Sequence, residues 1–247
     1  MRQDALADDG GGGQAGAARA AMAAGLRVGA LDCVADRSGA LFVERHRLLA
    51  VADLHLEKGS SFAARGALLP PYDSRQTLMA LAAAIARFDP AMVVVLGDTL
   101  HDRGAFDRLG SDERALIAGL QAGRDWLWLT GNHDPALPLA LGGAVHAELT
   151  FDGVAFRHIP TCGGTGPELA GHLHPAARVF GRGRTLRRRC FITDGHRCVL
   201  PAFGAYAGGL NVLDRAFAPL FPGRGFTAHV LGSDRVYAVD PARLASD

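Results

Sequence analysis

Two stretches of the sequence share one pattern, and this pattern constrains the fold more than any other feature. Residues 92–96 (MVVVL) form an apolar run followed by GDTLHD, and residues 125–130 (DWLWLT) form a mostly apolar run followed by GNHD. An apolar run of strand length predicts a central strand that is buried on both faces. The glycine allows a sharp turn at the carboxyl end of the strand, where open α/β sheets place their ligands. The pattern therefore predicts an α/β fold with a functional site at this edge.

The same arrangement continues on both sides of this pair. Upstream, residues 48–52 (LLAVA) lead into DLH; downstream, residues 154–158 (VAFRH) end in a histidine, and GHLH follows at residues 171–174. Carboxylate oxygens, an amide oxygen and imidazole nitrogens then stand at successive strand ends, which is the donor set of a divalent metal site. With this many donors, more than one ion is expected.

Length and composition limit the class of protein. The 247 residues are 49% hydrophobic and 21% charged, with a formal net charge of +1, as expected of a soluble globular protein. The four cysteines form no CxxC pair, which predicts reduced thiols and a cytoplasmic location. No apolar run approaches the roughly 20 residues needed to span a bilayer, so we expect no membrane contact.

The chain is expected to have one folded domain. We predict a flexible tail at residues 1–25 and a single domain at residues 26–247. The tail contains three aspartates, a glycine tract at residues 10–13 and an alanine-rich stretch. A secretory signal needs a basic start and a strongly apolar middle, and the tail has neither.

Strand and helix patterns alternate up to residue 144, which predicts βαβ units; short β-type runs between glycine-rich turns follow. The expected helices are residues 58–65, 74–88, with Ser74 as the cap, and 111–122. The other expected strands are residues 26–35, 40–43, 145–151, 154–159, 187–193, 197–200 and 236–239. The predicted fold class is α/β: a two-sheet β-sandwich flanked by helices, with the metal site on loops at strand ends.

Five ordered blocks carry a family resemblance. DLH, GDTLHD, GNHD, a later histidine and GHLH, within residues 53–174, resemble the signature of the calcineurin-like binuclear metallophosphoesterases. Further phrases are EKG at residues 57–59, LPPYD at residues 69–73 and LPAFGAY at residues 200–206. Together with GDTLHD they resemble the bacterial DNA-ligase-associated metallophosphoesterases, which are linked to the DNA-damage response.

The resemblance implies a role for each donor. Asp98 would bridge two divalent ions, expected to be manganese, with iron or zinc as alternatives. The first ion would be completed by Asp53, His55 and His174, and the second by Asn132, His158 and His172. In DLH, side chains two residues apart on extended backbone would point the same way. A hydroxide bridging the ions would be the nucleophile.

Two residues beside the ligands are predicted to be catalytic. By resemblance, His133 would donate a hydrogen bond or a proton to the phosphoryl group or the leaving oxygen, and Asp134 would orient the His133 ring. Each residue alone also has an ordinary structural interpretation: Asp53 could cap a helix, Gly131 could form a simple turn, and His158 could be a core histidine.

The resemblance implies a DNA phosphodiesterase or endonuclease, with DNA as the partner and a DNA ligase, helicase or nuclease as further repair partners. Arginines crowd together after GHLH, and such a cluster could hold a phosphate backbone, or could be a solvated strand edge. The candidate substrate contacts are His101, Lys58, Arg65, Arg187, Arg188 and Arg189. A hydrolase of a small nucleotide or phosphomonoester and a non-catalytic repair scaffold are the alternatives. The sequence leaves the native metal, strand preference and oligomeric state open.

Overall fold

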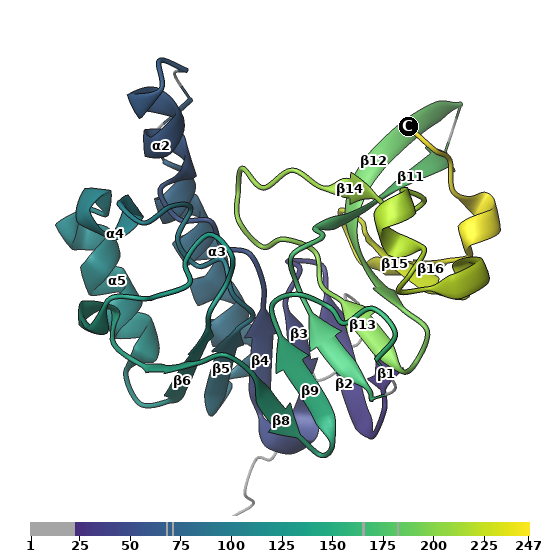
Figure 1. Ribbon diagram of the computed structural model, residues 1–247, viewed down its shortest axis with the longest axis horizontal. Coiled ribbons are helices and arrows are strands. Elements are labelled where there is room, and N and C mark those ends of the chain that lie inside the picture. Colours follow the sequence, from purple (N-terminus) through teal and green to yellow (C-terminus); the bar gives the residue numbers. More distant parts are fainter. Residues whose placement is uncertain (1–22, 68, 71, 165, 182) are drawn as a thin grey trace, which may run out of the picture.

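The computed structural model describes residues 23–67, 69–70, 72–164, 166–181 and 183–247, and their strands form two sheets packed face to face (Figure 1). The first sheet has, in spatial order, β1 (Ala23–Val28), β2 (Leu31–Asp36), β3 (Leu41–Val43), β4 (Leu48–Val51), β5 (Met92–Val95), β6 (Asp125–Leu129) and β7 (Ala144–His146). The second has β14 (Leu210–Asn211), β11 (Pro175–Gly181), β12 (Arg184–Thr193), β13 (Arg197–Val199), β10 (Glu168–Ala170), β9 (Val154–Arg157) and β8 (Leu149–Phe151). Strand β15 (Thr227–Leu231) pairs with β12 and with β16 (Val236–Val239).

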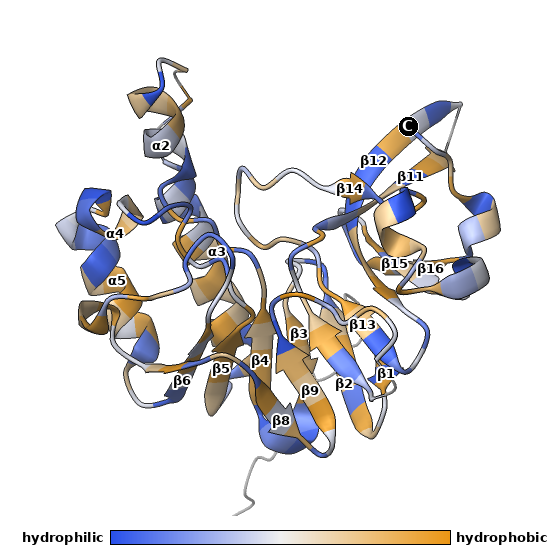
Figure 2. Ribbon diagram, in the orientation of Figure 1, coloured by the Kyte–Doolittle hydropathy of each residue, from blue (hydrophilic) through white to orange (hydrophobic). Residues whose placement is uncertain are grey.

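The apolar run that was predicted to be central is buried on both faces. In β5, Val93 and Val95 pack into the core beneath the helices, whereas Val94 and the following Leu96 pack into the core between the sheets. Alternate side chains of a strand point to opposite faces, so a strand covered on both sides needs apolar residues at every position. The strands accordingly form the apolar centre of the molecule (Figure 2).

Helices cover the outer face of the first sheet. These are α3 (Asp73–Phe88), α4 (Ala105–Arg108) and α5 (Ser111–Gln121), whereas α2 (Lys58–Ala64) projects away from the sheet (Figure 1). Leu78, Leu81 and Ile85 of α3 pack on the strands together with Ile117 of α5. The second sheet is covered instead by irregular chain and short 3₁₀ turns, where Phe217 contributes to the core. The 3₁₀ turns are Glu44–His46, Leu139–Leu141, Arg215–Phe217, Pro222–Arg224 and Pro241–Arg243.

The expected α/β sandwich and its three longer helices are confirmed, while several boundaries are wrong. The single strand expected at residues 26–35 is a hairpin, β1–β2, because the chain turns at Gly29, whose φ is +55°. The strand expected at residues 145–151 is two strands in different sheets, β7 and β8. Ser74 does not cap α3; its hydroxyl donates to the Glu57 carboxylate at 2.7 Å. The strands β10, β11, β14 and β15 were not predicted.

Two further expectations concern chemistry and membranes. All four cysteines are free, as expected. No helix of the described chain combines the length and apolar character needed to cross a bilayer. Most of the tail predicted for residues 1–25 lies outside the described residues, and β1 begins at Ala23. The single domain from residue 26 therefore stays a prediction.

Candidate metal centre

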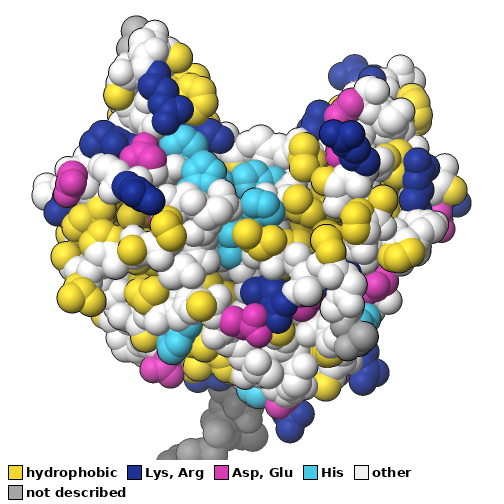
Figure 3. Space-filling view, viewed as in Figure 1, with side chains coloured by type: hydrophobic (Ala, Val, Ile, Leu, Met, Phe, Trp, Pro, Cys, Tyr) yellow, Lys and Arg dark blue, Asp and Glu magenta, His cyan; other side chains and the backbone are white. Residues whose placement is uncertain are grey.

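Each proposed ligand follows the carboxyl end of a parallel strand. In the first sheet, β4, β5 and β6 run parallel, and in the second sheet β9 and β10 run parallel. The side chains that follow these strands meet where the two sheets meet, in the depression seen between two projections in Figure 3. They are Asp53 and His55 after β4, Asp98 after β5, Asn132 after β6, His158 after β9, and His172 and His174 after β10.

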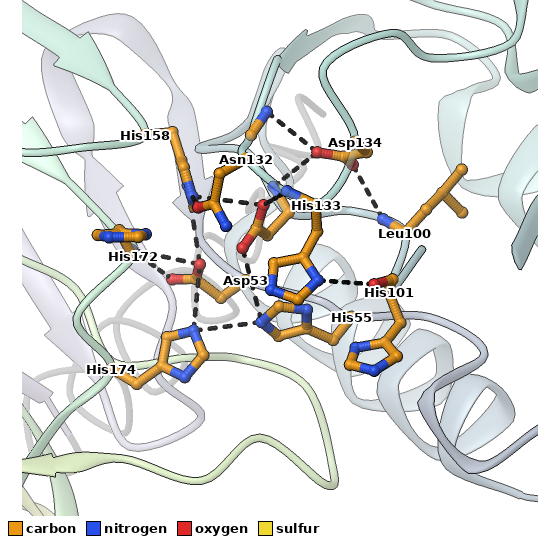
Figure 4. A network of polar contacts seen from close by, with 12 residues as sticks. Asp53, His55, Leu100, His101, Asn132, His133, Asp134, His158, His172 and His174 are labelled. Carbon is orange, nitrogen blue, oxygen red and sulfur yellow. Dashed lines mark hydrogen bonds and ion pairs between the residues drawn. The ribbon is translucent and has the colours of Figure 1, made fainter. Parts of the chain in front are cut away.

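Asp53, His55 and His174 form one cluster, which we call the first cluster (Figure 4). One donor atom from each of the three lies within 4.8 Å of the others. The Nε2 atoms of His55 and His174 are 3.2 Å apart, and His174 Nε2 is 3.3 Å from Asp53 Oδ1. Two imidazole nitrogens facing one carboxylate oxygen suit a shared cation.

Asp98, His158 and His172 form the second cluster, again with donor atoms within 4.8 Å of one another. His158 Nε2 is 2.9 Å from the amide oxygen of Asn132, and His158 Nδ1 is 2.9 Å from the Leu96 carbonyl. A carbonyl that accepts from one ring nitrogen leaves the other nitrogen free to bind a metal. Asn132 thus lies beside the second cluster, where the resemblance placed it.

The Asp98 carboxylate lies between the two clusters. Its Oδ1 is 3.3 Å from His158 Nε2 in the second cluster, and its Oδ2 is 3.8 Å from His55 Nε2 in the first. Each oxygen therefore faces a different cluster. A carboxylate in this position can reach two ions at once, which is the arrangement that two-metal hydrolysis requires.

The chemistry of these residues fits divalent cations. Asp53 and Asp98 are 0% and 2% exposed, and within the described residues their ion-pair partners are histidines, with no lysine or arginine. Buried carboxylates need a compensating charge. Burial, and then the neighbouring His174, lowers the pKa of His55 to about 3, so this imidazole stays neutral and keeps a lone pair for a metal.

Five of the seven proposed ligands share an uncommon backbone conformation. Asp53, His55, Asp98, His172 and His174 all have φ between +45° and +71°, in the left-handed region. Such φ values cost energy in residues other than glycine and concentrate at functional sites. The extended backbone expected for DLH is therefore wrong: the chain coils sharply there, and this turns both side chains into the site.

Burial and nearby groups set the charge of Asp98. Burial alone would raise the pKa of this carboxyl, but the hydrogen bond and charge of His158 and the backbone N–H of His133 lower the pKa to about 2. The His133 N–H donates to Asp98 Oδ1 at 2.9 Å. Asp98 is thus ionised at neutral pH, as a bridging ligand must be.

His133 and Asp134 lie beside the clusters but are not linked as predicted. His133 Nδ1 lies 2.7 Å from the His101 carbonyl, which orients the ring (Figure 4). The Asp134 carboxylate instead accepts the backbone N–H groups of Asp98, Leu100 and Gly131, at 3.1, 2.9 and 3.0 Å. The expectation that Asp134 orients the His133 ring is wrong. Asp134 ties together the loops after β5 and β6.

The lysine and arginine candidates fall into two groups. Lys58 and Arg65 lie near the His101 ring, where burial first and then the charge of Lys58 lower the pKa of His101 to about 4. On β12, Arg189 donates to the carbonyls of Ala202 and Phe203, and Arg187 donates to Gly209. Arg188 lies on the opposite face of that strand. Arg187, Arg188 and Arg189 therefore do not form one surface.

Two orienting groups could not be found from the sequence. The carbonyls of Leu96 and His101 hold the rings of His158 and His133, and main-chain oxygens carry no residue-type signal. Gly131, in contrast, is a residue type with a structural meaning, because a Cβ there would lie 2.1 Å from Asp98 Oδ1 and 2.7 Å from Asp134 Oδ1. Only glycine lets the loop after β6 approach the Asp98 carboxylate this closely.

Comparison with known proteins agrees with this geometry. The crystal structure of the Pseudomonas putida nuclease MPE is 28% identical, covering 88% of this chain and 100% of that chain with a TM-score of 0.69. No curated protein matches the chain. A family model described as calcineurin-like phosphoesterase, whose members use two divalent metals, matches residues 46–206 and so spans every predicted ligand. The chain therefore belongs to the calcineurin-like phosphoesterase family.

Proposed function

We propose that the protein is a metal-dependent phosphodiesterase that hydrolyses phosphodiester bonds in DNA. The position of Asp98, with one carboxylate oxygen toward each cluster, carries the proposal of two-metal hydrolysis. The similarity to a solved nuclease and the resemblance to DNA-ligase-associated enzymes support DNA as the substrate. The proposed ligands are Asp53, His55, Asp98, Asn132, His158, His172 and His174.

The ions, proposed to be manganese, would supply a water activated near neutral pH and would neutralise charge on the phosphoryl oxygens. The side chains around the ions would donate protons and bind the substrate. His133 is half-buried, and its ring lies against those of His55 and His101, with centroids 5.0 and 5.3 Å away. From there its imidazole would donate a hydrogen bond or proton to the phosphoryl or leaving oxygen. Lys58 and Arg65 would attract the phosphate backbone.

The surface suits a chain-like substrate. In Figure 3 the histidines lie in a saddle between the projection that carries α2 and the projection formed by β11 and β12. Asn132 is exposed, and His133, His172 and His174 are partly exposed, so the centre is reachable from outside. An open saddle with basic residues on both projections would admit a polymer that extends beyond the scissile bond. We also propose that residues 26–247 form a single domain. The proposed location is the cytoplasm, and the proposed partners are DNA repair proteins such as a ligase, a helicase or a nuclease.

The test is metal-resolved activity on several substrates. The purified full chain, loaded with Mn²⁺, Fe²⁺ or Zn²⁺, would be assayed on single-stranded, duplex and nicked DNA and on a small chromogenic phosphodiester. We expect Mn²⁺ to support cleavage of DNA. The His133→Asn variant should lose about 10²–10⁴-fold in kcat while retaining its metal, because it removes proton donation without removing a ligand.

The controls separate the alternative functions. His146→Asn, on edge strand β7 of the same sheet, should leave kcat unchanged. Hydrolysis of the small diester without cleavage of any DNA, with every metal, would favour a small phosphoester substrate. Absence of both activities in a metal-loaded protein would favour a scaffold.

A further inference from the structure

The β11–β12 hairpin carries a groove that is separate from the metal centre. The groove has a volume of about 1030 Å³, and we call it the arginine groove; its walls include Arg184, Leu186, Arg188, Val230, Tyr237 and Arg243. We propose that it binds a single-stranded segment of the nucleic acid whose cleavage is proposed above. This inference rests on that proposed function for its substrate class.

The charge of the groove favours an anionic ligand. Arg184, Arg188 and Arg243 are exposed, and none of them pairs with a carboxylate of the described residues. Among the described residues, the Arg188 side chain makes one hydrogen bond, to the Arg187 carbonyl at 3.3 Å. The acidic residue in the wall, Asp234, accepts from the Tyr237 hydroxyl at 2.9 Å. Three guanidinium groups are thus free to contact phosphates.

The floor of the groove favours nucleotides over a simple anion. Val179 and Leu186 are cross-strand partners on the hairpin, and Val230 and Val239 line the same space from β15 and β16. Bases stack on aromatic rings, and Tyr237 supplies one in the wall beside this apolar floor, with the arginines at the rim for the phosphates. A duplex keeps its base faces stacked inside, so a single strand is the form that this surface can use.

The groove lies close to the metal centre along the chain. Strand β11 begins at Pro175, directly after His174, and Arg188 pairs across the hairpin with Ala177. Three residues of strand from His174 to Ala177 span about 10 Å. Figure 1 shows the hairpin rising beside the site as one of the two projections. Because the groove lies on the face of β12 opposite Arg189, a strand held at the saddle would cross the hairpin to reach the groove.

The two faces of β12 carry arginines with different contacts. On one face, Arg189 holds the carbonyls of Ala202 and Phe203, just before Gly204, whose N–H donates to the Asp53 carbonyl. On the other face, Arg184 and Arg188 line the groove; four residues of strand separate them by about 13 Å. That spacing leaves room for a ligand longer than a single phosphate, lying along the hairpin.

The test uses the double variant Arg184→Glu/Arg243→Glu in the full chain. Binding of a fluorescent single-stranded oligonucleotide is measured by anisotropy in the presence of a chelator, so no cleavage is needed. We expect affinity to fall at least tenfold. The salt dependence should become shallower by about 1.4 in the slope of log K against log salt, because each phosphate contact on single strands contributes about 0.7. Activity on the small diester should be unchanged.

The matched control is Arg45→Glu/Arg215→Glu, which reverses two exposed arginines outside the groove. Unaltered oligonucleotide affinity in the groove variant, or an equal loss in the control, would overturn the proposal. So would an oligonucleotide that the wild type does not bind, or an equal loss of binding to polyglutamate, which would indicate a site for acidic peptides. If the groove variant fails to fold, Arg184→Gln/Arg243→Gln replaces it. A protein that binds the oligonucleotide through the groove but cleaves no DNA would refute only the proposed function.

Discussion

The metal centre has two halves, the side chains that follow strands of the first sheet and those that follow strands of the second. A buried carboxylate fixes loops of each half, but the two carboxylates differ in the groups that compensate their negative charge. In the first sheet, Asp134 accepts three backbone N–H groups and has no lysine or arginine partner within the described chain. In the second sheet, Glu168 accepts the N–H of Thr161 at 3.1 Å and pairs with the buried Arg197. Thr161 lies three residues after His158, so this pair holds the loop after β9.

The two carboxylates differ in this way because they lie at different distances from the proposed cation sites. Asp134 lies beside Asp98, and burial raises the pKa of Asp134 to about 6, with the Leu100 N–H opposing the shift and Asp98 adding to it. Bound cations would offset the free-energy cost of keeping the Asp134 carboxylate ionised in the interior. Glu168 begins β10, at the end of the strand away from His172, so it needs a cation of its own from the protein. We infer that Asp134 depends on metal for its stability and that Glu168 does not.

The strongest change removes the group that the two halves share. Asp98→Asn replaces one bridging oxygen with an amide nitrogen that cannot bind a cation. We expect kcat/KM on a phosphodiester to fall at least about a thousandfold, which corresponds to roughly 4 kcal/mol, with loss of at least one metal per chain. Kinetics and elemental analysis check this. Asp152→Asn, a surface carboxylate beside His46, is the control, and full metal content in Asp98→Asn would contradict a bridging role.

The second prediction concerns the second sheet, where the charge of Glu168 is compensated by Arg197. Glu168→Gln leaves Arg197 buried without its carboxylate, and loss of one partner of a buried pair costs about 3–5 kcal/mol. We expect that loss in the free energy of unfolding of the metal-free protein, measured by urea denaturation. The control is Glu148→Gln, whose partner is Arg157 but which is 47% exposed, so it should cost below about 1 kcal/mol. Equal effects would remove the distinction between the two carboxylates.

The third prediction concerns the first sheet, where we infer that the buried Asp134 carboxylate depends on bound metal. Asp134→Asn keeps one acceptor oxygen but turns an NH₂ group toward backbone N–H donors. We expect metal affinity to fall about 10–100-fold, as for other groups that hold ligands in place. Titration calorimetry measures it. Asp214→Asn is the control, since Asp214 also accepts a backbone N–H but is exposed. If Asp134→Asn instead destabilised the metal-free protein as much as Glu168→Gln does, metal dependence would be refuted.

The sequence predicted the first half better than the second, for a physical reason. Strands such as β5 are covered on both faces, so their apolar runs stand out in the sequence. The glycines and donors that follow them mark the carboxyl ends. Strand β10 has three residues, Glu168–Ala170, and begins with a charged side chain. Its strand character comes from pairing with β9 and β13, which lie apart from it in the sequence.

The convergence of the proposed ligands was predictable, but the way their side chains are held in place was not. The histidines and aspartates of the five blocks converge as the resemblance implied. The left-handed backbone at Asp53 and Asp98, and the turn of Asp134 toward backbone N–H groups, arise from contacts between loops distant in sequence. The arginines of β12 looked like one cluster, but strand alternation places neighbours on opposite faces. Arg182, in the same arginine-rich stretch after GHLH, lies outside the described residues.

The smallest predicted effect concerns the contact between the halves. A Cβ at Gly171 would lie 2.7 Å from Asp53 Oδ2, 2.9 Å from the Ala52 Cβ and 3.2 Å from the Leu96 carbonyl. Gly171→Ala should therefore push the loop after β10 away from the first sheet, at a cost of about 1–3 kcal/mol in unfolding free energy. Thermal unfolding with and without metal measures this.

Gly119→Ala provides the matched control, because Gly119 lies in α5 and a Cβ there would meet nothing within 4 Å. In a helix that change should stabilise by about 0.5–1 kcal/mol. The contrast isolates the clash from the general effect of replacing glycine. If Gly171→Ala weakens metal binding as well as stability, closure of the two sheets sets the distance between the clusters. If it lowers stability alone, the hydrogen bonds from the His172 N–H to the Asp53 carboxylate keep the clusters at their distance despite the displaced backbone.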